Sequence, residues 1–187
     1  MALTKAHRAP APLDDERLRE IALSYVGRYA TTRSKLRAYL QRKIRSRGWN
    51  GAGEPDLEAL ADTLAALGYI DDAAYALAKS RALSARGYGQ RRLNDELFTA
   101  GVGINDRAPA QLHAREQTLA AALSFARRRR LGPYSSVEAD PPQRKKWIAA
   151  MMRAGHSLRL ARAIAAMAPG AEIDEELLQE RLEAAED

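Results

Sequence analysis

The feature that most constrains the fold of this chain is a helical pattern that recurs along its 187 residues. Tyr25, Tyr75 and Phe125 occupy the same place in three successive predicted helices and are separated by equal intervals. A second register recurs with one common offset, as Leu93, Leu97 and Gly101 and then as Trp147, Met151 and Gly155. The sequence therefore predicts an all-α protein, built from three tandem three-helix repeats that form an elongated, curved array. Chance self-similarity in a chain rich in Ala and Leu is the alternative.

Composition and local signals support this helical prediction. Ala, Leu and Arg dominate, all three are strong helix formers, and no run of alternating β-branched residues predicts a sheet. Asp14, Asp56 and Ser157 are predicted helix caps, and the first helix is expected to reach about Ala30. The expected segments are a flexible arm at 1–13, repeats at 14–68, 69–114 and 115–170, and an acidic tail at 171–187.

The sequence lacks the residues that several classes of chemistry require. The chain has no cysteine, and His7, His113 and His156 stand apart from one another, so a metal site is not expected. No phosphate-binding glycine loop carries the required Lys-Ser/Thr, and no constellation predicts a catalytic residue. We expect a non-enzymatic protein without cofactor or small-molecule substrate. Because no signal-peptide core or membrane-length apolar stretch occurs, we also expect it in the cytoplasm.

Charge is unevenly distributed along the chain, whose formal net charge is +6. No Asp or Glu occurs from Ile21 to Gly53, a stretch that holds Arg33, Lys35, Arg37, Arg42 and Lys43. Such a basic helix face can bind phosphates, bind an acidic protein surface, or simply be solvated. A second basic run, Arg127 to Arg130, is open to the same interpretations and also suits a helix C-terminus.

One segment carries a family resemblance. Residues 64–76 read LAALGYIDDAAYA, which resembles the Leu-Gly-Tyr-Ile/Leu-Asp-Asp…Tyr/Phe-Ala signature of the RecX family. Arg81 and the run from Arg86 to Leu93 are similar to a second family element, and the likeness covers about residues 20–168. Physically, Gly68 suits the left-handed position after a helix, and Asp71 or Asp72 can cap the next one. We therefore expect a structural role at a repeat junction for Gly68, Tyr69, Asp71, Asp72 and Tyr75.

The resemblance implies a function in DNA repair, recombination and the SOS response. RecX-like proteins bind the RecA–DNA filament and limit its recombinase, ATPase and coprotease activities. By this resemblance we expect a monomeric negative regulator of RecA, and binding to single- and double-stranded DNA stays open. The expected contacts are the basic residues Arg33, Lys35, Arg37, Arg42, Lys43, Arg86, Arg91 and Arg92. The alternative is a helical DNA-binding module that acts without RecA.

Overall fold

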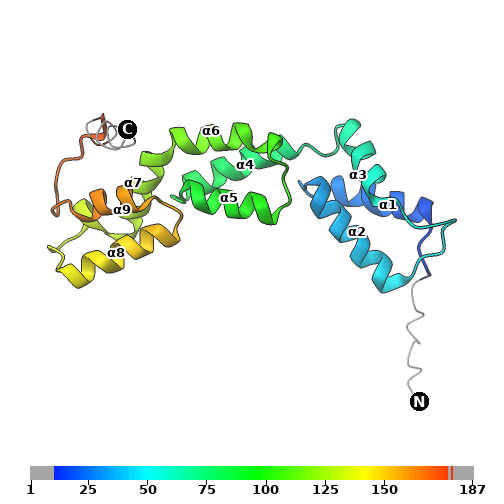
Figure 1. Ribbon diagram of the computed structural model, residues 1–187, viewed down its shortest axis with the longest axis horizontal. Helices are drawn as coiled ribbons and strands as arrows, with labels where there is room; N and C mark the ends of the chain where they lie inside the picture. The colour runs from blue at the N-terminus through cyan, green and yellow to red at the C-terminus, as the bar shows by residue number, and fades with distance from the viewer. Residues whose placement is uncertain (1–10, 177, 179–187) are drawn as a thin grey trace, which may run out of the picture. The chain divides into compact units, whose positions relative to one another are not determined.

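The computed structural model describes residues 11–176 and 178, and this part of the chain confirms the all-α prediction. It contains nine α-helices, two short 3-10 helices (Asn105–Arg107 and Gly132–Tyr134) and no β-strand (Figure 1). The α-helices are α1 (Asp15–Val26), α2 (Arg33–Arg47), α3 (Leu57–Ala66), α4 (Asp72–Ala85), α5 (Gln90–Thr99), α6 (Ala108–Glu116), α7 (Thr118–Arg129), α8 (Pro141–Arg153) and α9 (Leu158–Ala165). Over the residues described, no helix combines the length and apolar character needed to span a membrane.

The chain folds into two compact units. Unit 1 contains the residues up to Tyr75 together with Ala100–Val102, and unit 2 contains Ala76–Thr99 and the residues from Gly103 onward. The division into three repeats stays a prediction. Most of the predicted arm and tail, at 1–10, 177 and 179–187, lies outside the described residues.

Short polar side chains begin six of the helices, among them Asp71 at the start of α4. The side chains of Asp14, Thr32, Asp56, Asp140 and Ser157 each accept a hydrogen bond from the backbone N–H three residues later. This satisfies one of the donors that a helix N-terminus leaves free. The predicted caps Asp14, Asp56 and Ser157 are thus confirmed. The first helix ends at Val26 rather than near Ala30, because Gly27, a weak helix former, follows directly.

Four helices end in the same backbone motif. At α3, the N–H of Gly68 donates to the carbonyl of Ala65 and that of Tyr69 to the carbonyl of Leu64. This pair of bonds is a Schellman motif, and it requires positive φ at the residue after the cap. The residues in that position at the ends of α3, α4, α7 and α8 are Gly68, Gly87, Arg130 and Gly155. The expected left-handed role of Gly68 is confirmed by its φ of +78°.

Unit 1 is built around α1, α2 and α3, which lie side by side in Figure 1. Its core contains the buried side chains of Leu13, Leu18, Ala22, Leu36, Leu40, Ala61, Leu64 and Ile70. Leu13 is fully buried. Its N–H donates to the carbonyl of Gly48, and its C=O accepts from the N–H of Asn50, so that it pairs with the backbone on both sides of Trp49. Residue 13 therefore does not belong to a flexible arm, because burial and two backbone hydrogen bonds hold it against the loop after α2.

Unit 2 contains a core formed mainly by α7, α8 and α9. Phe125, Trp147 and Met151 are buried in it, and Leu178 of the acidic tail is buried in the same core. Between α4 and α6, the buried Ser80 donates a hydrogen bond to the carbonyl of Ala110. This bond satisfies a hydroxyl group that would otherwise be costly to bury.

In each unit, a hydrogen bond joins the start of one helix to the carbonyl of a residue that follows another helix. We call this an end-to-start contact. In unit 1, the Thr32 hydroxyl at the start of α2 donates to the carbonyl of Ala100, which follows α5. In unit 2, the N–H groups of Gly89 and Arg91 at the start of α5 donate to the carbonyls of Ala154 and Gly155, which follow α8. The contact in unit 2 places the partly negative end of α8 at the partly positive start of α5, which is favourable.

Candidate partner-binding surface

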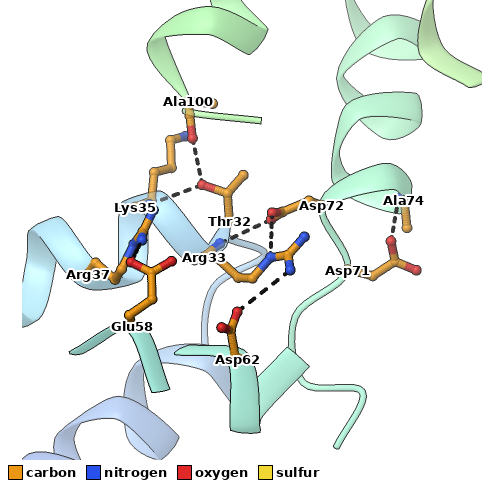
Figure 2. A network of polar contacts seen from close by, with 10 residues as sticks. All are labelled: Thr32, Arg33, Lys35, Arg37, Glu58, Asp62, Asp71, Asp72, Ala74 and Ala100. Atoms are coloured by element: carbon orange, nitrogen blue, oxygen red, sulfur yellow. Dashed lines mark hydrogen bonds and ion pairs between the residues drawn. The ribbon is translucent and has the colours of Figure 1, made fainter. Parts of the chain in front are cut away.

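The first half of the basic helix α2 is engaged inside unit 1. Asp72, which is buried at the start of α4, accepts hydrogen bonds from the backbone N–H of Arg33 and from its Nε, both at 3.0 Å (Figure 2). Arg33 also lies 3.7 Å from the carboxylate of Asp62 in α3. Asp72 therefore provides a second cap for α2, and Arg33 joins α2, α3 and α4.

Arg37 and Asp71 take part in the same network. The guanidinium of Arg37 pairs with the carboxylate of Glu58 in α3. Asp71 caps α4 by accepting the N–H of Ala74 at 2.8 Å, so that the two neighbouring acids stabilise different helices (Figure 2). The sequence placed Arg33 and Arg37 among the partner contacts, whereas the structure gives both of them intramolecular carboxylate partners.

Lys35 and Tyr75 form another contact between α2 and α4. The Lys35 ammonium donates to the Tyr75 hydroxyl and lies 4.8 Å from the centroid of its ring. Both residues are half-buried. Of the signature residues, Tyr69 is 54% exposed. The apolar residue that packs back on the junction is Ile70, which is buried.

The second half of α2 offers cations without acidic partners. Among the residues described, Arg42, Lys43 and Arg45 form no ion pair, and Arg42 and Arg45 are exposed. Lys43 lies 5.3 Å from the ring centroid of Tyr39. That ring stacks on Tyr25 with centroids 4.1 Å apart.

A third tyrosine extends this stack. Tyr29 is tilted against Tyr25, with ring centroids 5.3 Å apart, and is 58% exposed. The Tyr25–Tyr29–Tyr39 cluster was missed from the sequence as a group. The spacing of Tyr25 and Tyr29 was a partial signal, whereas the stacking of Tyr39 depends on how α1 packs on α2.

The predicted contacts of unit 2 lie at the start of α5 and just before it. Arg86 and Arg91 are exposed, while Arg92 pairs with Glu96 at 3.0 Å. Glu96 also lies 3.4 Å from Lys79. Burial by itself would raise the pKa of Glu96, but the charges and hydrogen bonds of Lys79 and Arg92 outweigh this effect and hold the pKa below its usual value. Arg92 is therefore partly neutralised by its neighbour.

The structure thus separates the predicted basic residues into two groups. Arg33, Lys35, Arg37 and Arg92 have polar or acidic partners within the chain. Arg42, Lys43, Arg86 and Arg91 have no acidic partner in the part of the chain that the structure describes. The same part contains no group of three or more His, Asp or Glu side chains placed to hold a metal ion.

Comparison with known proteins identifies the family. The chain is 32% identical over 171 residues to the regulatory protein RecX of Myxococcus xanthus, a match covering 84% of this chain and 88% of that relative. The chain belongs to the RecX family. The regulatory protein RecX of Agrobacterium fabrum is 31% identical over 153 residues, covering 80% of this chain and 82% of the relative.

A solved structure agrees with this assignment at the level of the fold. The crystal structure of RecX from Lactobacillus salivarius is similar with a TM-score of 0.58 and 19% identity, covering 80% of this chain and 92% of that one. No protein-family profile matches the chain. In residues 64–76, Asp71 and Asp72 each accept a hydrogen bond from a backbone N–H at the start of a helix.

Proposed function

We propose that this RecX-family chain is a negative regulator of the RecA recombinase. It binds the RecA–DNA filament and inhibits its recombinase, ATPase and coprotease activities. The observation that carries the proposal is the relationship to two regulatory RecX proteins over at least 80% of the chain. We further propose that it acts as a cytoplasmic monomer without catalytic activity, and that it touches more than one RecA protomer.

The proposed contacts are the basic residues that lack acidic partners in the described chain. In unit 1 these are Arg42 and Lys43, and in unit 2 they are Arg86 and Arg91. An exposed cation keeps its full charge for an acidic protein surface or a phosphate, whereas one held by a carboxylate must first lose that partner. Arg33, Lys35, Arg37 and Arg92 are therefore secondary contacts in this proposal.

The test is DNA-dependent ATP hydrolysis by RecA of the same organism on single-stranded DNA, with the chain titrated in. We expect inhibition at well below one chain per RecA, because a regulator bound to a filament affects many protomers. The double variant R42E/K43E should lose most of the inhibition at unchanged helicity. K145E/K146E is the matched control, because it reverses two exposed cations of α8. Full inhibition by R42E/K43E would contradict the proposed contacts.

The second candidate function is direct binding to DNA without RecA. It is favoured by the tyrosine cluster Tyr25–Tyr29–Tyr39 next to Lys43, because bases stack on aromatic rings beside basic residues. This candidate predicts that the chain inhibits RecA only at concentrations that coat the DNA. Anisotropy titration of a labelled oligonucleotide without RecA, compared with the inhibition curve, distinguishes the two functions.

A further inference from the structure

Unit 2 contains a cationic cavity that joins Arg86, one of the predicted partner contacts, to two arginines of α7. It has a volume of about 260 Å³ and is lined by Arg86, Tyr88, Phe125, Arg128 and Arg129. Three of these five side chains are arginines and none is acidic. Sites for whole small molecules usually measure about 300–1,000 Å³, so this cavity suits a smaller group.

The cavity forms because Gly87 allows α4 to end against α7. A Cβ atom on Gly87 would lie 2.8 Å from the backbone nitrogen of Phe125 and 2.9 Å from the carbonyl of Ala121. Residue 87 also has a φ of +68°, which glycine adopts at little cost. This close approach brings Arg86, at the end of α4, next to Arg128 and Arg129 at the end of α7.

The three arginines are not neutralised within the chain. No carboxylate of the described residues forms an ion pair with Arg86, Arg128 or Arg129. The C-terminal dipoles of α4 and α7 offset about half a charge each, which leaves an excess of positive charge. Because like charges repel across a small cavity, an anion that binds there relieves unfavourable electrostatic energy.

Aromatic rings accompany the cations on this surface. The guanidinium groups of Arg86 and Arg92 lie 5.4 and 5.9 Å from the centroid of the Tyr88 ring. Arg127, which precedes the two cavity arginines on α7, lies 5.1 Å from the ring centroid of Tyr134. A row of cations beside aromatic rings suits a polymer of phosphates and bases better than a single anion.

We propose that the Arg86–Arg128–Arg129 cavity binds a backbone phosphate of single-stranded DNA. Guanidinium groups hold phosphate oxygens through paired, charge-assisted hydrogen bonds, and three of them surround a cavity of fitting size. This inference rests on the second candidate function, direct binding to DNA, and assigns it a site in unit 2; it does not depend on the proposed regulation of RecA.

The test uses the full chain and a labelled oligothymidylate, with anisotropy titrations over a series of salt concentrations. For single strands, each phosphate contact contributes about 0.7 to the slope of log K against log salt. The variant R128Q/R129Q removes two of the three cations around one phosphate, so it should lower the slope by about 0.7 and weaken binding at low salt. The matched control K145Q/K146Q removes two exposed cations from α8 in the same unit and should leave the slope unchanged.

Two outcomes would overturn the inference once circular dichroism shows that both variants are folded. The first is an unchanged slope and affinity in R128Q/R129Q, or an equal loss in the control. The second is that ATP displaces the labelled oligonucleotide at a lower total concentration of phosphate groups than unlabelled oligothymidylate does. That result would assign the cavity to free nucleotides. Inhibition of RecA ATP hydrolysis by R128Q/R129Q is measured separately, so a failure here leaves the proposed regulation of RecA intact.

Discussion

Asp71 and Asp72 are neighbours with identical side chains, yet their contributions to stability differ. Asp71 is an exposed cap, and Asn caps helices about as well as Asp, so D71N should change the free energy of unfolding by less than about 0.5 kcal/mol. Asp72 is buried and holds two donors of Arg33, so D72N should cost about 1–3 kcal/mol. Urea denaturation of both variants measures the difference. Equal effects would show that the Asp72–Arg33 contact contributes little.

His156 gives unit 2 a pH-dependent stability. Burial lowers the pKa of His156 below its usual value of about 6.5, although the hydrogen bond to the Gly87 carbonyl acts in the opposite direction. As the pH falls below about 6.5, the unfolded chain takes up a proton that the folded chain does not, so stability is full above this pH and is lost below it. Between about pH 7.5 and 5.5, the urea midpoint should fall more for the wild type than for H156Q. A parallel decline in both proteins would contradict this role.

At the same scale, the sequence predicted which residues are basic but not which of them are available. The carboxylates that hold Arg33 and Arg37 come from α3 and α4, at least 21 residues away along the chain. Ion pairs between distant segments depend on how helices pack, and no local pattern encodes them. Because no acid occurs between Ile21 and Gly53, the sequence predicted more unpaired positive charge on α2 than the structure shows.

At the scale of the helix, the end of α7 is strained relative to the ends of α3, α4 and α8. Arg130 has a φ of +54°, where the other three helices have glycine. A non-glycine residue in this conformation costs about 1–2 kcal/mol. R130G should therefore raise the free energy of unfolding by about 1 kcal/mol, while R129G, inside the helix, should lower it by a similar amount. Urea denaturation measures both changes. A loss of stability in R130G would show that the Arg130 side chain has a stabilising contact.

Helix starts were the part of the fold that the sequence predicted best. Caps such as Asp14 and Ser157 bond to their own helices three residues later, so the signal is local. The contact of Leu13 with the loop around Trp49 was missed because it joins segments on either side of α1 and α2. The candidate surface was also predicted only where its signals are local. The tyrosine cluster was missed because it forms only when α1 packs on α2.

At the scale of the whole molecule, each unit has its own end-to-start helix contact with a glycine in it. A Cβ on Gly101 would overlap Ser34 in unit 1, and one on Gly155 would lie 2.5 Å from the Arg92 nitrogen in unit 2. G101A should therefore accelerate hydrogen exchange at the start of α2, and G155A at the start of α5, with little effect on the other helix start. Hydrogen exchange followed by mass spectrometry resolves these segments. Loss of protection throughout the chain in both variants would contradict the local nature of the two contacts.

The start of α8 differs from the start of α5 in the groups that it offers to the end of another helix. At α5 the two backbone donors belong to Gly89, just before the helix, and to Arg91, its second residue. The matching positions at α8 are Asp140 and Pro142. Proline has no N–H to donate, and the negative carboxylate of Asp140 repels the carbonyl end of an approaching helix. A helix end that met the start of α8 as α8 meets α5 would therefore lose one of the two hydrogen bonds and face a like charge, unless both residues were replaced.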